Sequence, residues 1–316
     1  MSPPMNVLSP IADNGYPSDY FFARVRARRA ALPRDRGGRV RKEAQPEPAA
    51  EVDKDRRLLQ NELRWCFRQM NGALREIFRT VFLFMELKTI VLCLRYHAAL
   101  KPDRIEAVLV DSLLAREIRA SLTDGTETEN AISQIAACFG PGFLTPAWKN
   151  ETTPRNMIKR FESELFASFM QWTAETRLRP EITFFFRLLI DCRNLLLAAK
   201  HRRWAIKEPC RLLQGGLIGD NKVLGTTDLD TGTAAAGVFA GSWADGLSYD
   251  GYPQLERALF QRVGAILTRR SRSGDGIDLT LDYLWQRSLA ARNDSLVRQA
   301  EAGMLPPELL NGEFIQ

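Results

Sequence analysis

Residues 86–95 read ELKTIVLCLR, and 105 residues later residues 191–200 read DCRNLLLAAK. At all ten positions the second stretch keeps the broad class of the first, which is an acid, an apolar residue, a base, a small polar residue, an apolar run and a final base. A third, weaker copy lies a further 99 residues on, where residues 291–293 repeat residues 192–194. Self-similarity at a long period indicates one structural unit used several times, each burying its apolar face against its neighbours. The repeat therefore predicts a helical scaffold.

Apolar residues recur at three- and four-residue intervals over long segments, which is typical of helices with one buried face. The long repeat helices are expected over residues 74–94, 181–200 and 279–297, and further helices over residues 158–172 and 255–266. Alternation of polar and apolar residues never lasts beyond a few positions, so strand signals are nearly absent. The fold class predicted from the pattern is all-α.

The same pass along the chain predicts its organisation. Residues 1–18 are an irregular tail, and residues 19–53 are a short helix followed by a basic, proline-rich linker. The first helical unit is expected over residues 54–150, the second over residues 151–220, and a loop with the third unit over residues 221–316.

Each unit is expected to close with a short helix that begins at a proline and an acid. These short helices are predicted over residues 102–114, 208–216 and 306–312. The stretch from Gly216 to Gly251 is rich in Gly, Thr, Asp and Ala, and we expect a loop there with one short helix over residues 234–243.

The formal net charge of the chain is +6, and its excess is local. From Arg24 to Arg57 there are twelve Lys or Arg against six Asp or Glu, which equals the excess of the whole chain. Such an arm is compatible with nucleic acid, acidic lipid or an acidic partner. Because its arginines alternate with Pro, Gly and Glu, a solvated linker is the simpler interpretation.

No membrane-spanning stretch is expected, because no apolar run approaches the length of a membrane helix. No secretory signal is expected either, because the N-terminus lacks a short basic start followed by an apolar core. The chain has five cysteines without close paired spacing, an odd and scattered count that favours a reducing compartment. The sequence therefore predicts a cytoplasmic protein.

Motifs for chemistry are few. His97 and His201 are the only histidines, and each follows the last base of a repeat helix, a position typical of structural roles. A single Asp-Thr-Gly at residues 230–232 lacks the second copy that aspartic-protease chemistry needs. Asp228 and Asp230 resemble the start of a calcium loop, but Phe239 stands where the bidentate Glu belongs. No catalytic, cofactor or metal site is therefore expected.

Polar residues inside the repeat helices are the candidates for function instead. Arg187 and Asp191 are four residues apart and can share one helix face, which Asn194 also joins. Asn is a mediocre helix former, so a reason is needed for Arg193-Asn194 and for its copy, Arg292-Asn293. Surface exposure is one reading. The other is that these groups lie at helix–helix contacts or line a shared central hole.

Several motifs together resemble the family of central-stalk proteins in V/A-type rotary ATPases, which are named C in the V/A-type enzymes and d in the eukaryotic vacuolar enzyme. The opening helix YFFARVRAR, with Arg24 and Arg28, is similar to the first helix of that family. The others are the run at residues 191–195, the Leu-Leu-x-Gly-Gly at residues 212–216, and the closing Arg292-Asn293 helix followed by PPELL. The first copy departs from the pattern, because Thr89 stands where the other copies have Asn.

The resemblance implies a non-catalytic rotor subunit, built as a funnel of three similar helical units around a central hollow. Its partners would be the shaft proteins D and F and the membrane rotor ring, with no nucleic acid and no span of its own. The expected contact residues are Arg24, Arg28, Asp191, Arg193, Asn194, Arg292 and Asn293. The alternative hypothesis is a basic helical adaptor or nucleic-acid-binding protein that uses the arm from Arg24 to Arg57. An enzyme with its site in the loop from Gly216 to Gly251 is a more distant alternative.

Overall fold

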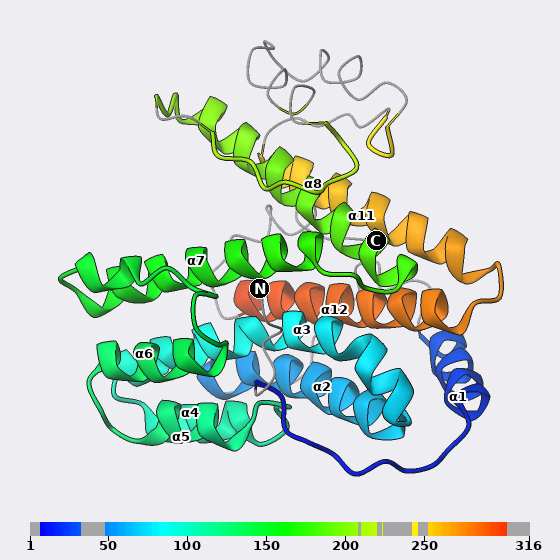
Figure 1. Cartoon of the computed structure of the whole chain (residues 1–316), viewed down its shortest axis with the longest axis horizontal. Helices are drawn as coiled ribbons and strands as arrows, with labels where there is room; N and C mark the ends of the chain where they lie inside the picture. Colours follow the sequence, from blue (N-terminus) through cyan, green and yellow to red (C-terminus); the bar gives the residue numbers. More distant parts are fainter. Residues whose placement is uncertain are drawn as a thin grey trace. The chain divides into compact units, whose positions relative to one another are not determined.

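The computed structural model describes residues 7–32, 48–207, 210–219, 223, 242–245 and 252–301. Within these residues the protein is all-α, with ten α-helices and no strand, as the periodicity predicts (Figure 1). The helices are α1 (Ser18–Ala30), α2 (Pro48–Gln69), α3 (Gly72–Ala98), α4 (Pro102–Leu109), α5 (Arg116–Thr123), α6 (Thr128–Cys138), α7 (Pro154–Glu175), α8 (Pro180–Arg203), α11 (Tyr252–Ser271) and α12 (Gly276–Glu301). One 3-10 helix, η1, spans Ala147–Asn150.

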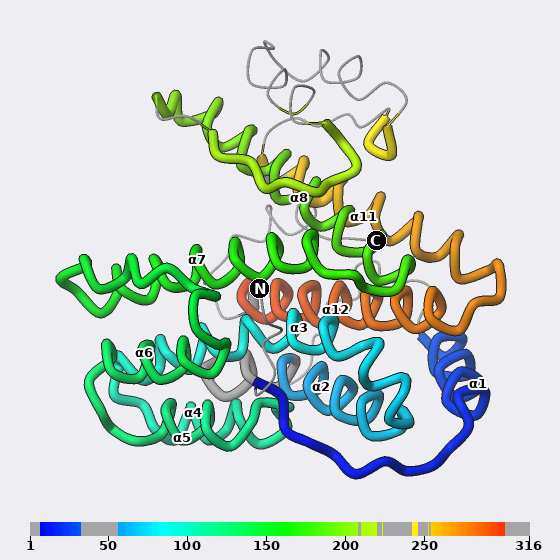
Figure 2. The backbone as a smooth tube through the Cα atoms, in the orientation of Figure 1, coloured from blue at the N-terminus to red at the C-terminus, as the bar shows by residue number. Residues whose placement is uncertain are grey.

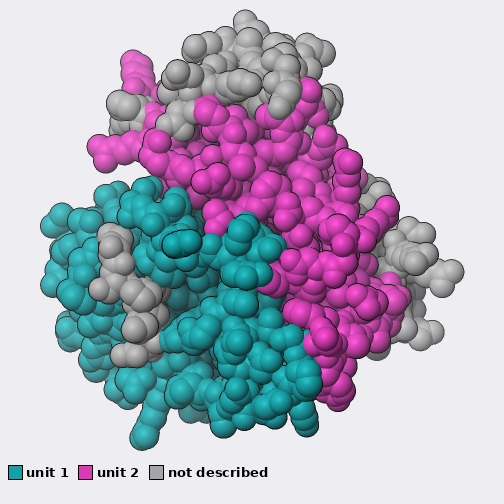
Figure 3. Space-filling view, turned by 45° about the vertical axis from the view of Figure 1, so that its right-hand side comes forward, with its two compact units in different colours: residues 1–18, 56–182 teal, residues 19–55, 183–316 magenta. Residues whose placement is uncertain are grey.

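The chain divides into two compact units, which Figure 3 distinguishes by colour. Unit 1 comprises residues 1–18 and 56–182, and unit 2 comprises residues 19–55 and 183–316. Each unit contains one of the two long helices that carry the strong repeat, α3 in unit 1 and nearly all of α8 in unit 2.

In unit 1, helix α3 is the central element, and α4, α5, α6 and α7 all pack against it. Asn71 stands just before its first residue, and the Asn71 side chain accepts a hydrogen bond from the Leu74 amide and so caps the helix. Helix α2 packs on α3 through Phe67 and Phe82, with ring centroids 4.9 Å apart. Because α3 is covered by several neighbours, it is buried on more than one face.

The N-terminal stretch of unit 1 has no helix but is part of the packed structure, and Figure 2 shows it in dark blue before α1. Val7 and Leu8 are buried. The Ser9 amide donates to the Leu113 carbonyl at 2.8 Å, and the Ala115 amide donates to the Val7 carbonyl at 2.8 Å. The described part of this segment, predicted as an irregular tail, is therefore irregular but held against the loop after α4.

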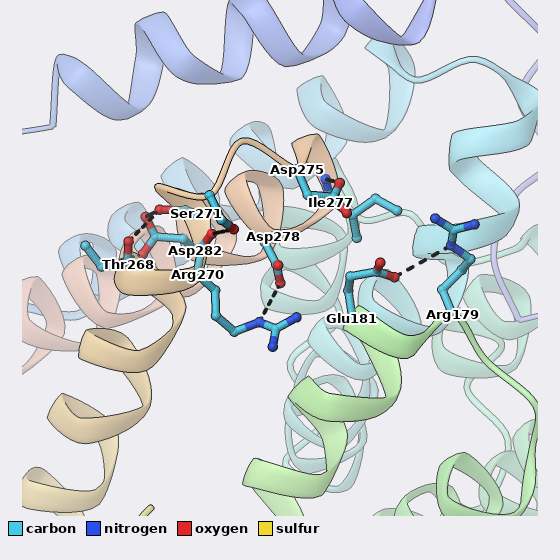
Figure 4. A network of polar contacts seen from close by, with 10 residues as sticks. Arg179, Glu181, Thr268, Arg270, Ser271, Asp275, Ile277, Asp278 and Asp282 are labelled. Carbon is cyan, nitrogen blue, oxygen red and sulfur yellow. Dashed lines mark hydrogen bonds and ion pairs between the residues drawn. The ribbon is translucent and has the colours of Figure 1, made fainter.

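In unit 2, helices α11 and α12 form an antiparallel pair joined by a short turn (Figure 1). Buried Asp282 of α12 accepts hydrogen bonds from Thr268 Oγ1 of α11 at 2.8 Å and from Arg29 Nε of α1 at 2.7 Å. Near the turn, Arg270 Nε donates to Asp278 Oδ1 at 3.0 Å (Figure 4). These ionic contacts join α1, α11 and α12 within the unit.

One sequence prediction is wrong in the described residues. A short helix was expected over residues 208–216, but residues 210–216 are not helical. The Leu213 amide donates to Asn194 Oδ1 at 2.9 Å, and the Leu213 carbonyl accepts from Asn194 Nδ2 at 2.9 Å. Since that side chain takes both backbone groups of Leu213, they are not available for helical hydrogen bonds.

Other differences concern boundaries. Helix α2 begins at Pro48, six residues before the expected start at Lys54, and α5 and α6 were not predicted. The linker over residues 33–47, the expected helix over residues 306–312, and most of the loop from Gly216 to Gly251, Asp228 and Asp230 included, lie outside the described residues.

Candidate functional site

Two buried carboxylates, at the first position of the two strong repeat copies, hold backbone segments that return to their helices. In unit 1, Glu86 lies on α3 and is almost wholly buried. Its Oε1 accepts from the Leu113 amide at 2.8 Å, and its Oε2 accepts from Ser112 Oγ at 3.0 Å. These donors lie 27 and 26 residues after the acid. We call this arrangement the Glu86 clasp.

The second copy repeats the arrangement in unit 2. Asp191 of α8 is fully buried, and its oxygens accept from the Leu217 amide at 3.1 Å and the Ile218 amide at 3.2 Å. These donors lie 26 and 27 residues after the acid, the same separations as in unit 1. A third donor, Trp243 Nε1, reaches Asp191 Oδ2 at 2.6 Å. We call this set the Asp191 clasp.

The repeat extends to the helix ends. Leu100 follows α3 with φ 52°, and Ala205 follows α8 with φ 47°, so each helix ends on a left-handed residue at the same repeat position. The backbone closes in the same way at both, because the Lys101 amide donates to the Tyr96 carbonyl and the Ile206 amide donates to the His201 carbonyl. This is the Schellman pattern of helix termination. Corresponding residues thus build corresponding backbone in the two units.

Burial changes the acidity of both carboxyls. It raises the pKa of Glu86, and the hydrogen bonds from Leu113, Thr89 and Ser112 oppose that rise. Burial also raises the pKa of Asp191, to about 6, against the hydrogen bonds from Trp243, Ile218 and Leu217. Both carboxyls are fully occupied by donors of their own unit, so their role is to position backbone.

The fit around Asp191 depends on a glycine. A Cβ atom built on Gly216 would lie 2.0 Å from Asp191 Oδ1, closer than any real contact of that kind. Residue 216 must therefore lack a side chain if the carboxylate is to receive the amides that follow it.

Of the remaining predicted site residues, Arg292 contacts a second helix, whereas the ring contact of Arg24 lies within its own helix. Arg24 of α1 lies with its guanidinium carbon 5.6 Å from the centre of the Tyr20 ring. Arg193 of α8 is half-buried, and burial lowers its pKa. Arg292 of α12 pairs with Glu256 of α11 at 2.7 Å and lies over the Phe260 ring. Arg28 and Asn293 are half-buried.

Sequence analysis missed several parts of the clasps. It identified Asp191 and Asn194 but expected Arg187 as the partner of Asp191. Arg187 is exposed and acts on Asp191 through its charge, which lowers the pKa of that carboxyl. The hydrogen bonds to Asp191 come from Leu217, Ile218 and Trp243. It did not single out Glu86, although Glu86 occupies the same repeat position as Asp191. That shared position is the signal that would have found it.

Comparison with known proteins finds no family model that matches this chain, and no curated protein matches it. Among the described residues, no group of three or more His, Cys, Asp or Glu is arranged to hold a metal ion. In the same part of the chain, no helix combines the length and the apolar character that crossing a bilayer requires.

The titration of Asp191 makes a testable prediction. Its pKa rises from 3.8 in a free carboxyl to about 6 in the folded protein, so the fold binds this proton more tightly than the unfolded chain does. The contribution of Asp191 to stability therefore increases as pH falls from about 6 to about 4, by up to about 3 kcal/mol. Urea unfolding of wild type and Asp191→Asn across this range measures it, because the other carboxyls are common to both proteins and position 191 titrates only in wild type. A stability difference that does not change with pH would contradict the prediction.

Proposed function

We propose that this chain is the non-catalytic central-stalk (rotor) subunit of a V/A-type proton- or sodium-translocating ATPase or ATP synthase. In that role it links the shaft of the D and F proteins to the membrane rotor ring. The observation that carries the proposal is the repeated clasp, in which Glu86 and Asp191 hold backbone at the same separations along the chain. The repeated clasp supports the inference that the chain contains a duplicated helical unit, and the resemblance to this family rests partly on that duplication.

The clasps suit a mechanical role. A coupling between a turning shaft and a ring needs stiffness and two contact surfaces, and it needs no active site. A buried carboxylate that accepts two or three hydrogen bonds restrains the returning segment far more than apolar packing alone, because any displacement leaves buried donors unpaired. The clasps thus favour units that transmit force without deforming.

In this proposal the three helical units form a funnel around a central hollow, and the protein is cytoplasmic and peripheral to the membrane. The third unit of this repeat, which is not one of the two compact units described above, is built around α12, where Ala290 stands at the repeat position of Asp191. Because Asp191 and Asn194 are occupied inside unit 2, contact with partners is assigned to the more accessible residues of the predicted set. Those are Arg24, Arg28, Arg193, Arg292 and Asn293. A stable grip needs about 800 Å² on each partner.

A binding experiment tests the proposal. The purified chain is passed over immobilised D/F shaft complex and, separately, over rotor ring in detergent, with an unrelated coiled coil of similar charge as the control. Retention by the shaft or the ring, but not by the control, is the expected result. Failure to bind both would remove the proposed function.

The same preparation tests the alternative of a nucleic-acid-binding protein. That hypothesis predicts binding to duplex DNA or RNA that weakens steeply with salt and is lost when residues 24–57 are deleted. The described part of this arm already makes internal contacts, since Arg29 pairs with Asp282. We therefore expect no such binding.

A further inference from the structure

The C-terminal end of α8 exposes apolar and basic side chains together. Trp204 is 57 % exposed and Ile206 is 37 % exposed, and between them Ala205 takes its left-handed conformation. Arg203 and Lys207 flank this pair and are also exposed. We call residues 203–207 the α8 corner. Unlike a frayed end, it is set by three backbone hydrogen bonds, in which the amides of Trp204, Ala205 and Ile206 donate to the carbonyls of Lys200, Arg202 and His201 respectively.

Unit 2 supports this corner from one side. Tyr252, the first residue of α11, has its ring centroid 6.4 Å from that of Trp204, and Lys200 Nζ lies 5.0 Å from the centre of the same tyrosine ring. The indole is thus held against the unit while much of its surface faces solvent. Over residues 200–211 the sequence has five Lys or Arg and a single acid, so this stretch of the chain is strongly basic.

The turn after α3 in unit 1, around Leu100, has the same backbone as the α8 corner but a different composition. The turn itself therefore does not require an exposed Trp with several cations. Leu100 is 87 % exposed at the equivalent position. Yet the residues after it carry both charges, with Lys101 and Arg104 balanced by Asp103 and Glu106. The combination of an exposed Trp with a cluster of cations is therefore particular to the α8 corner. Part of that charge has a local role, because cations in the last turn offset the negative end of a helix dipole.

We propose that the α8 corner binds an anionic membrane surface. Trp is enriched at the level of lipid headgroups, where its ring is accommodated and its N–H remains hydrated. Arg and Lys beside it gain about fivefold in affinity for each cation placed near an acidic leaflet. A nucleic acid would attract the same cations, but Ile206 offers neither a stacking face nor a hydrogen bond to a base. An interfacial lipid layer takes up both apolar side chains.

This inference goes beyond the proposed function, because it requires neither shaft nor ring. The binding is expected to be weak and reversible. Stable anchoring to a membrane takes two separate binding signals, and the α8 corner supplies one. Within a membrane-bound assembly, that weak contact would add to the protein contacts by raising the effective concentration of the chain at the surface.

Vesicle sedimentation tests the proposal. The full chain is mixed with vesicles of phosphatidylcholine alone or of phosphatidylcholine with phosphatidylserine. Binding is expected only to the second kind, and it should weaken as salt is raised. Arg203→Glu with Lys207→Glu should lower the partition coefficient by at least tenfold, because two attractive charges become repulsive. Trp204→Ser should lower it several-fold without changing its salt dependence.

A matched control keeps the test specific. Arg155→Glu with Lys159→Glu makes the same change in net charge at two exposed positions of α7 in unit 1. Circular dichroism checks that all variants remain folded. The proposal is overturned if wild type does not bind the anionic vesicles, or if the α7 variant loses as much binding as the α8 variant. It is also overturned if duplex DNA, and no vesicle, binds in a manner that Arg203 and Lys207 control.

Discussion

Replacing Glu86 by alanine is expected to destabilise unit 1 by about 3 kcal/mol. The substitution removes the acceptor of three donors, the Leu113 amide and the hydroxyls of Thr89 and Ser112, in a part of the protein that water does not reach. Each buried donor left unpaired costs about 1–3 kcal/mol, and the lost side chain also leaves a cavity. Alanine also removes a carboxyl whose ionised form is disfavoured by burial, as its raised pKa shows, and this gain offsets part of the cost.

Glu86→Gln is the matched control. The amide oxygen can accept from Leu113, and the amide nitrogen can donate to Ser112 Oγ, because a hydroxyl is both donor and acceptor. We expect this variant to lose about 1 kcal/mol, as for one altered hydrogen bond. Urea unfolding followed by circular dichroism gives both free energies of unfolding. Equal losses for the two variants would show that the clasp is not the cause.

Hydrogen exchange locates the effect. The loop that Glu86 holds also pairs with the N-terminal stretch, through the Ser9 and Ala115 amides. In Glu86→Ala these two amides should lose protection before the core of α3 does, since the loop is released while the helix keeps its own hydrogen bonds. Unchanged protection at Ser9 and Ala115 would contradict this account of the clasp.

Gly216→Ala is expected to destabilise unit 2 by about 2–4 kcal/mol. The new Cβ would lie 2.0 Å from Asp191 Oδ1. The carboxylate has no room to turn away, because it is fully buried and holds three donors. Either the loop moves and the amides of Leu217 and Ile218 lose their acceptor, or Asp191 adopts a strained rotamer. Both outcomes are costly.

Two variants isolate the clash. Gly219→Ala, three residues on, meets nothing within 4 Å and should change stability by no more than about 0.5 kcal/mol. In Asp191→Ala the oxygen is gone, so adding Gly216→Ala should cost much less there than in wild type. The double-mutant cycle from urea unfolding measures this coupling. Additive effects would rule out the contact between residue 216 and Asp191 as the reason for the glycine.

The two clasps show how far sequence reasoning extended. The repeat was visible because both acids stand at the head of matching apolar runs, and Asn194 drew attention as a poor helix former inside a helix. What they bind was not visible. The partners of Glu86 and Asp191 lie 26 or 27 residues away, and Trp243 lies 52 residues from Asp191. No periodic pattern links residues at such separations.

The wrong prediction of a helix over residues 210–216 also arose because a residue distant in the sequence decides the local structure. Pro209 and the closing Gly215-Gly216 are reasonable local signals for a short helix, and the first copy does form α4 in the corresponding place. In the second copy the Asn194 side chain takes both backbone groups of Leu213. A contact from α8, outside the segment, overrides the local preference, and in the first copy Thr89 has no amide with which to do the same.

The sequence by itself determined that this protein is helical, where its long helices lie, and that two of them begin their repeat with an acid. Those properties follow from the spacing of neighbouring residues, and helical hydrogen bonds join groups only four residues apart. Only the tertiary structure decided that Glu86 and Asp191 are buried, which amides they receive, and that residue 216 must be glycine. The physical reason is that buried polar groups must find partners wherever the chain returns, and that return is a property of the whole fold.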